Sequence, residues 1–282
     1  MAIDRRTTFS IVRGWSAHQV PQHAVEIDFD HPQARGLVGL YIPGGRSGFR
    51  DLCSVGPALT PHTAGTFGQS SLGPGLNCNA NSSGASSSVR PTQYEFASTN
   101  VAVVHLGYHL ATQATGSDSP IVALNRSGGG SPYYPWNLAL FNNANGITFE
   151  CSAGGPFNTA VLADIGINSL AVTFGTQNGN SVTMYKNGTS LGGGSLTSAI
   201  TYYSDDLFEI GVNTAYQTRY YNGISLAAWV YNTGSVQMPA STVAWLAREP
   251  FAMLRPVVRR SYSIPGVVAA PPPTQARAMV MA

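Results

Sequence analysis

Apolar residues recur along the chain between residues 36 and 231, either alternating with polar residues or in short continuous runs. Alternation, as in Val182-Thr-Met-Tyr185, is typical of a strand with one buried face. The continuous run 226–231 predicts a central strand that is buried on both faces. Turn sequences such as 142–146 and 177–180 separate these segments and predict hairpins. The predicted strands are 36–42, 101–108, 120–124, 136–141, 147–151, 169–174, 181–185, 208–211 and 223–231.

The pattern predicts an all-β fold, a two-sheet antiparallel sandwich, with one short helix near the C-terminus. We expect the helix at about 240–249, capped by Ser241 or Thr242 and stopped by Pro250. The segment 56–88 is rich in Gly, Pro, Ser and Asn, which favours an irregular loop with short strands.

Both ends of the chain lack strand periodicity. We predict an N-terminal arm at 1–34, a sandwich domain at 35–251 and a C-terminal extended arm at 252–282. The triproline 271–273 favours an extended polyproline conformation in the second arm. Such arms are expected to become ordered on a partner, and the arginines and tyrosine of the second arm are candidate contacts: Arg255, Arg259, Arg260 and Tyr262.

Charge narrows the range of partners. Only 10% of the residues are charged, against roughly 25% in typical domains. The net charge is +2, and the basic residues near the C-terminus are too few and too scattered for a nucleic-acid site. We expect no membrane contact, because no apolar run is long enough to span a bilayer and no secretory leader is recognisable at the start. The three cysteines fit no metal spacing and are expected to be free.

Several segments, taken in order, resemble the concanavalin A-like/laminin-G (LamG) jelly-roll superfamily. They are Ser-Leu-Ala-Val-Thr-Phe (169–174), Val-Thr-Met-Tyr-Lys-Asn-Gly (182–188), Phe-Glu-Ile-Gly (208–211) and the region 221–231. Gly-Leu-Val-Gly-Leu-Tyr (36–41), followed by Arg-Asp-Leu (50–52), resembles the opening strand and turn of that superfamily. The resemblance implies a jelly roll and covers about two thirds of the chain.

The edges of the domain carry a narrower resemblance. The segments 27–37 and 246–256 are similar to sequences that flank such a jelly roll in tailed-bacteriophage virion proteins. This resemblance implies a capsid decoration or head-fibre protein, or else a tail component. Its partners would be other virion proteins, such as a major capsid or tail protein, together with further copies of the same chain. The expected location is the virion, assembled in the host cytoplasm.

A candidate catalytic motif is Glu-Ile-Asp-Phe-Asp (26–30), which is similar to the catalytic strand of laminarinase-type glycosidases of this fold. Alternate carboxylates on one strand face suit the two roles of glycoside hydrolysis. However, Asp30 replaces the acid/base glutamate, the motif precedes the first predicted sandwich strand, and His31-Pro32 ends it. We therefore predict a charged segment, no catalytic residue and no enzyme.

Metal and cofactor sites are not predicted. Asp205-Asp206 forms a pair of carboxylates suited to calcium, but no second acidic loop matches it, so a solvated turn is the preferred interpretation. His105 and His109 lie on one face of a predicted strand without a third ligand and are interpreted as structural. No dinucleotide or phosphate-binding fingerprint appears.

Clustered aromatic residues suggest an alternative function, which is recognition of host surface glycans. Exposed aromatic side chains stack on sugar rings or form protein contacts, although packing inside the sandwich is the commoner role. The candidate ligand-binding residues are Tyr133, Tyr134, Trp136, Tyr216, Arg219 and Tyr220. The sequence thus predicts a virion structural protein, with a carbohydrate-binding module or adsorption protein as the alternative.

Overall fold

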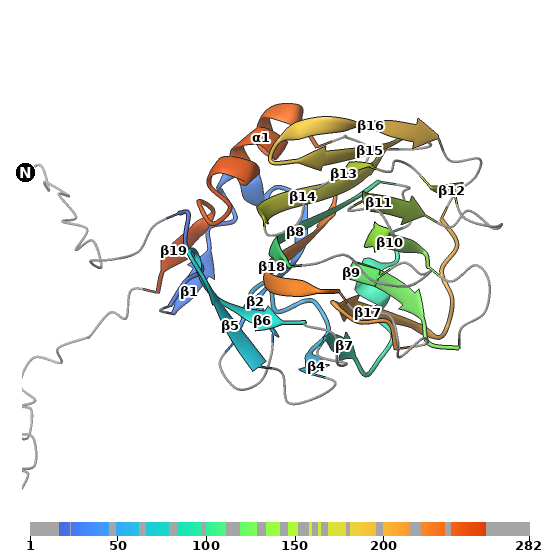
Figure 1. Cartoon of the computed structure of the whole chain (residues 1–282), viewed down its shortest axis with the longest axis horizontal. Helices are drawn as coiled ribbons and strands as arrows, with labels where there is room; N and C mark the ends of the chain where they lie inside the picture. Colours follow the sequence, from blue (N-terminus) through green and yellow to red (C-terminus); the bar gives the residue numbers. More distant parts are fainter. Residues whose placement is uncertain are drawn as a thin grey trace, which may run out of the picture.

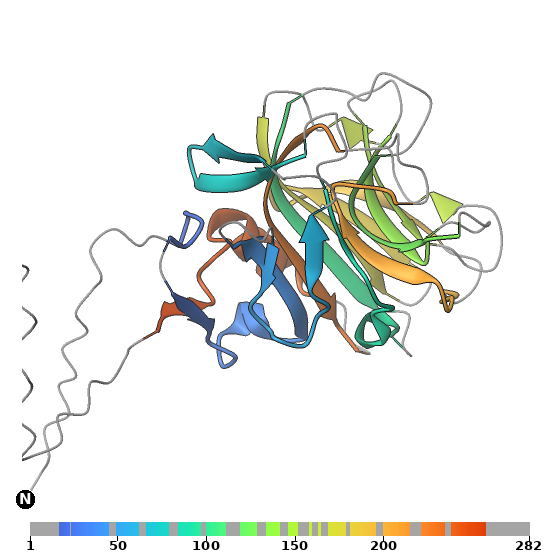
Figure 2. The same cartoon turned by 90° about the horizontal axis from the view of Figure 1, so that it is seen from below.

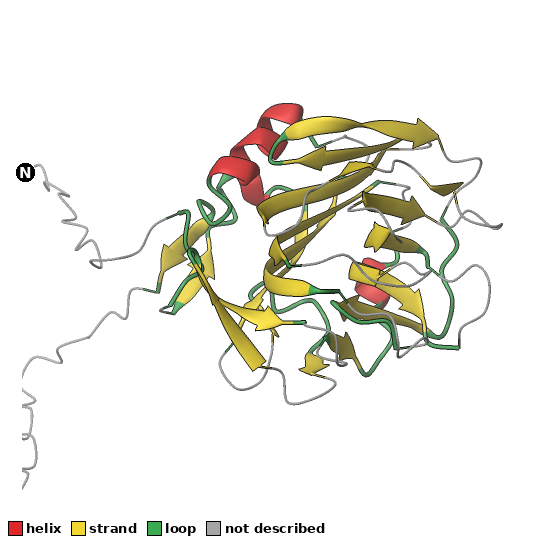
Figure 3. Ribbon diagram, viewed as in Figure 1, coloured by secondary structure: helices red, strands yellow, loops and turns green. Residues whose placement is uncertain are grey.

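Two antiparallel β-sheets face each other in the computed structural model, and a layer of short elements covers one of them (Figures 1 and 3). The structure describes residues 17–22, 24–44, 49–61, 66–78, 84–96, 100–110, 119–128, 134–141, 146–151, 158–159, 163–164, 169–178, 181–195, 200–214, 221–234 and 238–257.

The first sheet has eight strands in the order β12-β11-β10-β9-β17-β7-β4, with β13 also paired to β11. Its central strands are long apolar segments with turn residues at their ends, as the sequence pattern predicts. The bounds are β4 Leu59–Pro61, β7 Ala85–Ser87, β9 Ser119–Arg126, β10 Trp136–Phe141, β11 Gly146–Cys151, β12 Asn158–Thr159, β13 Ala163–Asp164 and β17 Asp206–Ile210.

The second sheet has nine strands in the order β16-β15-β14-β8-β18-β2-β3, and the β5–β6 hairpin joins it through β18. The predicted central strand 226–231 lies within β18, between β8 and β2, and all six of its residues are buried. The bounds are β2 Leu37–Pro43, β3 Phe49–Asp51, β5 Thr66–Ser70, β6 Gly73–Asn77, β8 Val101–His109, β14 Ser169–Asn178, β15 Ser181–Lys186, β16 Thr189–Ser195 and β18 Gly223–Asn232.

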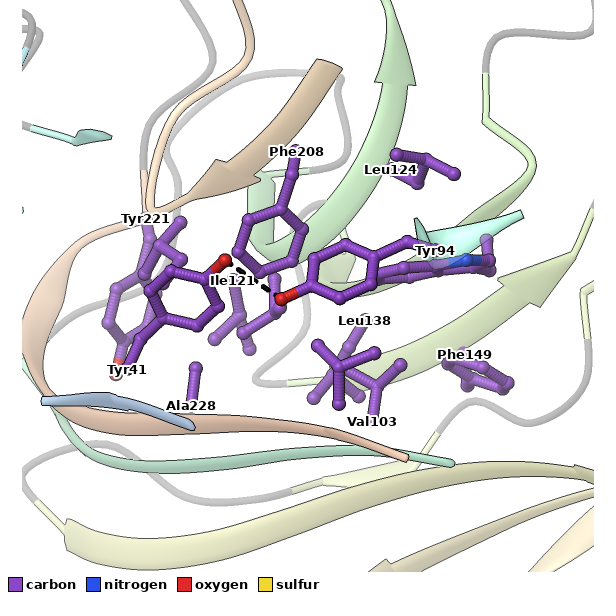
Figure 4. Packing of buried hydrophobic residues seen from close by; sticks show 14 of the residues in the cluster. Tyr41, Tyr94, Val103, Ile121, Leu124, Leu138, Phe149, Phe208, Tyr221 and Ala228 are labelled. Atoms are coloured by element: carbon purple, nitrogen blue, oxygen red, sulfur yellow. Dashed lines mark hydrogen bonds between the residues drawn. The ribbon is translucent and has the colours of Figure 1, made fainter. Parts of the chain in front are cut away.

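One hydrophobic core fills the space between the two sheets. At its centre the phenol oxygens of Tyr41 and Tyr94 lie 2.8 Å apart, and Phe208 packs on both rings (Figure 4). Tyr94 ends the short 3₁₀ helix η3 (Thr92–Tyr94). Burial raises the pKa of both phenols, so they stay neutral hydrogen-bonding groups.

A second core lies on the outer face of the nine-stranded sheet. It is covered by the 3₁₀ helix η1 (Pro32–Ala34), the helix α1 (Ala240–Arg248) and a two-stranded ribbon of β1 (Val25–Ile27) and β19 (Leu254–Pro256) (Figure 2). The helix contributes Val243 and Leu246. The molecule is therefore a sandwich with an added third layer on one side only.

The predicted all-β sandwich with one short C-terminal helix is confirmed. Two details differ. The N-cap residue of α1 is Pro239 and the helix has no side-chain cap, so the expectation for Ser241 or Thr242 is wrong. The glycine-rich β16 was missed, because glycine carries no apolar pattern to read, whereas β4, β5, β6 and β7 are short strands within 56–88, as expected there.

The described parts of the two predicted arms pack on the domain. Val20, Val25, Ile27 and Ala34 belong to the second core, as do Met253 and Leu254. β1 and β19 pair with each other, and the N–H of Val257 donates to the carbonyl of Ala24 at 3.0 Å. The packed domain therefore extends beyond the predicted boundaries of 35 and 251 on both sides. Residues 1–16 and 258–282 lie outside the described residues.

Candidate functional site

The outer face of the eight-stranded sheet carries a row of polar side chains. Strand register places one residue from each of five neighbouring strands side by side, across β7, β17, β9, β10 and β11. These row residues are Ser86, Glu209, Ala123, Asn137 and Glu150. All of them are buried.

Alternation along each strand explains why the row faces outward. Phe208, Leu124, Leu138 and Phe149 are the neighbours of the row residues on their strands, and all belong to the core between the sheets (Figure 4). Since successive side chains point to opposite faces, the row lies on the other side of the sheet. Thr148 lies two residues before Glu150 on β11, and Asn125 lies two residues after Ala123 on β9, so both also face outward.

Glu209 is the centre of a hydrogen-bond network on this face. Its carboxylate accepts from Asn125 Nδ2 at 2.7 Å, from the backbone N–H of Thr214 at 2.9 Å and from the hydroxyl of Thr214. Asn125 Nδ2 also donates to Asn213 Oδ1 at 3.0 Å, and Asn213 Nδ2 donates to the phenol of Tyr134 at 3.1 Å. Burial raises the pKa of Glu209 to about 7, although these hydrogen bonds oppose the shift.

A second network lies on the neighbouring strands of the same face. Asn137 Nδ2 on β10 donates to Glu150 Oε2 on β11 at 3.2 Å. Cross-strand partners in a sheet lie close enough for such side-chain pairs. The two carboxylates thus hold the amides of Asn125 and Asn137 in fixed orientations.

Among the described side chains of this face, three buried polar atoms have no hydrogen-bond partner. They are Asn125 Oδ1, Asn137 Oδ1 and Thr148 Oγ1, on the adjacent strands β9, β10 and β11. Leaving a buried polar group unpaired costs roughly 1–3 kcal/mol. Other buried atoms also lack partners, among them the indole nitrogens of Trp136 and Trp229. The three atoms on the outer face differ because they gather on adjoining strands beside two carboxylates.

The predicted aromatic ligand residues divide into two groups. Tyr134 and Trp136 are almost completely buried, at 1% and 0% exposure. Trp136 belongs to the core between the sheets, because the alternation of β10 points it inward, so we no longer consider it a sugar-stacking residue. Tyr133, Tyr216, Arg219 and Tyr220 lie outside the described residues.

The candidate catalytic motif begins on β1 of the ribbon, where Ile27 packs into the second core, and continues past the end of that strand, outside both sheets. Glu26 and Arg255 form an exposed ion pair with 2.8 Å between Oε1 and Nε, and Asp28 Oδ1 lies 3.9 Å from Nη1 of the same arginine. The motif is therefore part of a surface charge cluster, as the preferred interpretation of the sequence expects. Of the predicted arm contacts, only Arg255 is described, while Arg259, Arg260 and Tyr262 lie outside the described residues.

Asp205 and Asp206 point to different surroundings. Asp205 pairs with Arg126 at 3.2 Å and accepts from the N–H of Gly128, and its pKa is lowered although partial burial acts to raise it. Asp206 accepts from the N–H of Tyr203 at 2.6 Å, and burial raises its pKa to about 6. Each carboxylate has a protein partner, but Asp206 is fully buried and its Oδ1 accepts no hydrogen bond from the described residues, so the predicted solvated turn is wrong for Asp206.

The two histidines also have structural surroundings. His105 Nε2 lies 2.9 Å from Ser225 Oγ, and His109 Nδ1 lies 3.0 Å from the phenol oxygen of Tyr221. Burial lowers the pKa of His109 to about 3 and also lowers that of His105, so both rings are neutral. Among the described residues, no group of three or more His, Cys, Asp or Glu side chains is placed to hold a metal ion.

Two cavities lie on the other side of the molecule. One of about 290 Å³ is lined by Arg35, Gly36 and Asn232 and by the start of α1. The other, of about 210 Å³, lies between α1 and the outer face of the nine-stranded sheet, beside His18 and Leu106. In the described part of the chain, no helix is both long and apolar enough to span a membrane.

Neither a protein-family model nor a curated protein matches the sequence. Solved structures do match. Domain 4 of AbnA, an extracellular GH43 arabinanase from Geobacillus stearothermophilus solved in complex with arabinotriose, aligns with a TM-score of 0.57 and 14% identity. The match covers 75% of this chain and 98% of that domain. At this identity the likeness shows the fold alone.

Two further matches are parts of larger proteins. Trypanosoma rangeli sialidase aligns with a TM-score of 0.56 and 13% identity over 78% of this chain and 33% of the sialidase chain. The receptor-binding domain of botulinum neurotoxin type G aligns with a TM-score of 0.53 and 13% identity over 76% of this chain and 51% of that domain. This chain therefore spans about a third to a half of those two structures. All three support the predicted jelly-roll type of sandwich.

Proposed function

We propose that this chain is a non-catalytic recognition module that binds a glycan over the outer face of the eight-stranded sheet. The observation that carries the proposal is the set of unpaired buried atoms on Asn125, Asn137 and Thr148. Buried polar groups in native proteins are nearly always hydrogen-bonded, so a cluster without partners calls for an explanation, and we propose a ligand. Sugars, with many hydroxyl groups, are ligands of matching chemistry.

The comparisons support this choice. The arabinanase domain, which matches over nearly its whole length, was solved with arabinotriose, and the toxin match is a receptor-binding domain. These matches support a recognition role on this fold, and the polar row supplies the site for it.

The spacing of the two carboxylates argues for binding rather than hydrolysis. Glu209 and Glu150 belong to β17 and β11, which are separated by β9 and β10. Three strand spacings amount to about 14 Å between their backbones. Glycosidases that use two carboxylates hold them roughly 5–9.5 Å apart. Glu209 and Glu150 are thus too far apart for that mechanism. The row instead forms an extended polar surface.

Because the row residues are buried, a glycan can reach them only if neighbouring side chains move. Tyr134 and Asn213 lie on the same face and are linked by one hydrogen bond. We expect them to shift when a glycan binds, which would slow association below the usual range of 10⁵–10⁷ M⁻¹s⁻¹.

The decisive variant is Thr148→Val, which removes an unpaired hydroxyl at nearly constant volume. Because Thr148 Oγ1 has no partner, we expect unchanged or slightly higher stability. Glycan affinity, measured by isothermal titration on oligosaccharides found with a glycan array, should fall by about 5- to 30-fold.

Thr173→Val is the control, because Thr173 lies on β14 of the nine-stranded sheet and, between the outward-facing Val172 and Phe174, faces the core between the sheets rather than the polar row. It should leave affinity unchanged. Unchanged affinity in Thr148→Val, or an array on which the wild-type protein binds no glycan, would overturn the proposal.

A second candidate is a structural component of a tailed-phage virion, held through its terminal segments as a capsid decoration or head-fibre protein. The observation that favours it is the β1–β19 ribbon, which brings the two terminal segments together on the side away from the eight-stranded sheet (Figure 1). Attachment on one side and display of the opposite face are compatible with either function.

Deletion of residues 258–282 tests this candidate. The cut must fall after β19, because Met253 and Leu254 are buried in the second core. We expect an unchanged melting temperature and loss of the protein from purified particles, measured as copy number. Normal incorporation of the truncated protein would rule out attachment through that segment.

A further inference from the structure

The carboxylates on the outer face fix the orientation of the side-chain amides of Asn125 and Asn137. Glu150 accepts from Asn137 Nδ2, and Glu209 accepts from Asn125 Nδ2. A carboxylate accepts hydrogen bonds and donates none, so it fixes the NH₂ group toward itself. The opposite orientation would place two oxygens against each other. The amide carbonyl oxygens of Asn125 and Asn137 are therefore the free ends.

The face thus offers acceptor oxygens to a ligand, next to two acidic side chains. Asn125 Nδ2 already donates twice, to Glu209 and to Asn213, which leaves its Oδ1 unpaired. The described side chains of the two networks and the row are neutral or acidic, and none is cationic. The nearest arginine on these strands, Arg126, pairs with Asp205 and stacks 4.1 Å over the ring of Tyr203.

We infer that the ligand is a neutral oligosaccharide whose hydroxyl groups donate to Asn125 Oδ1 and Asn137 Oδ1. A sugar bearing a carboxylate or a sulfate would place an acceptor-only anion against these oxygens and beside Glu150 and Glu209. Like charges and unpaired acceptors disfavour such a ligand. This inference rests on the proposed function and names the class of glycan.

Glu150 and Glu209 are positioning residues in this scheme. They act on the ligand through the asparagines, by holding each carbonyl oxygen outward. Discrimination of this kind is strong, because a buried polar group without its partner penalises the wrong ligand.

The first experiment compares neutral and acidic sugars of similar size. The wild-type protein is titrated calorimetrically with arabinotriose, maltotriose, cellotriose and lactose, and with 3′-sialyllactose and trigalacturonic acid. Lactose and 3′-sialyllactose form a matched pair that differs by one acidic sugar. We expect at least one neutral sugar to bind, and every acidic sugar to bind at least 10-fold more weakly.

The second experiment changes the orienting carboxylate. In Glu150→Gln the new amide can donate to Asn137 Oδ1, which allows Asn137 to turn over and present its N–H groups. We expect affinity for the neutral sugar to fall at least 10-fold and the preference for neutral over acidic sugars to narrow. Glu95→Gln, at a surface residue paired with Arg90, is the control and should change neither value.

The outcomes separate the inference from the function on which it rests. If none of the neutral or acidic sugars binds, the proposed function fails, and the inference fails with it. If an acidic sugar binds as tightly as its neutral counterpart, the inference is overturned while glycan recognition stands. If Glu150→Gln keeps its melting temperature, its affinity and its preference, the positioning role is overturned.

Discussion

The outer faces of the two sheets are both buried, yet one is apolar and the other is polar. On the nine-stranded sheet, Leu106, Val172, Phe174 and Trp229 face outward and pack against α1, η1 and the ribbon. On the eight-stranded sheet, the corresponding positions hold Asn125, Asn137, Glu150 and Glu209. The first face is buried by apolar packing, which the hydrophobic effect favours.

The contrast separates a face whose burial stabilises the fold from a face to which we assign the proposed binding function. An apolar face under a helix needs no further explanation, because burial itself stabilises it. A buried face of amides and carboxylates loses hydration and regains it only through hydrogen bonds. Where some of those bonds are missing, as at Asn137 Oδ1, the face is costly for folding and suited to binding.

The largest loss of stability is expected from a substitution on the apolar face. Phe251 is fully buried and packs 5.7 Å from the ring of Trp229. Phe251→Ala should lower the free energy of unfolding by about 3–5 kcal/mol, measured by urea denaturation, without changing sugar affinity per folded molecule. Phe29→Ala, at a residue that is 62% exposed, is the control and should change the free energy of unfolding little. A loss below about 1 kcal/mol for Phe251→Ala would mean that the third layer does not fold together with the sheets.

An intermediate effect, dependent on pH, is expected on the polar face. The pKa of Glu209 is raised to about 7 in the folded protein, so its contribution to stability is complete below about pH 4.5 and is lost as the pH rises through 7. The wild-type protein should lose roughly 1–3 kcal/mol of stability across this window relative to Glu209→Gln.

The measurement is denaturation of both proteins at several pH values. Asp206, whose pKa is raised to about 6, is present in both and cancels in the difference. A difference between the two proteins that does not vary with pH would show that Glu209 stays in one protonation state.

The smallest effect is expected on the ribbon. Arg255 is 58% exposed and pairs with Glu26, which is 49% exposed. Arg255→Ala should cost less than about 1 kcal/mol, and the loss should shrink further in high salt. A larger, salt-independent loss would indicate that the aliphatic part of the arginine, rather than its charge, holds the ribbon.

The sequence predicts the fold well because the long strands carry their own signal. Segments such as 101–108 and 223–231 are apolar enough to identify alone, and β8 and β18 follow them closely. The ribbon strands have three residues each, and their pairing joins residues about 230 positions apart, so no local pattern reveals them.

The polar row was missed for a similar reason. Each strand supplies one polar residue between apolar neighbours, and the row exists only once the registers are known. Part of it was within reach: the predicted hairpin of 136–141 and 147–151 places Asn137 opposite Glu150. Glu209 enters the row from a strand more than fifty residues away, which a single sequence does not place.

The ribbon has one more consequence, which concerns how the domain can be built into other chains. The carbonyl of Ala17 accepts from the N–H of Phe251, and that of Ala24 accepts from the N–H of Val257, so the first and the last described segments of the chain lie next to each other in the third layer. Domains whose ends meet in this way tolerate insertion into a surface loop of another protein, and they tolerate circular permutation. The same sandwich can therefore be grafted as a closed unit, with both connections on one side and the polar face turned outward.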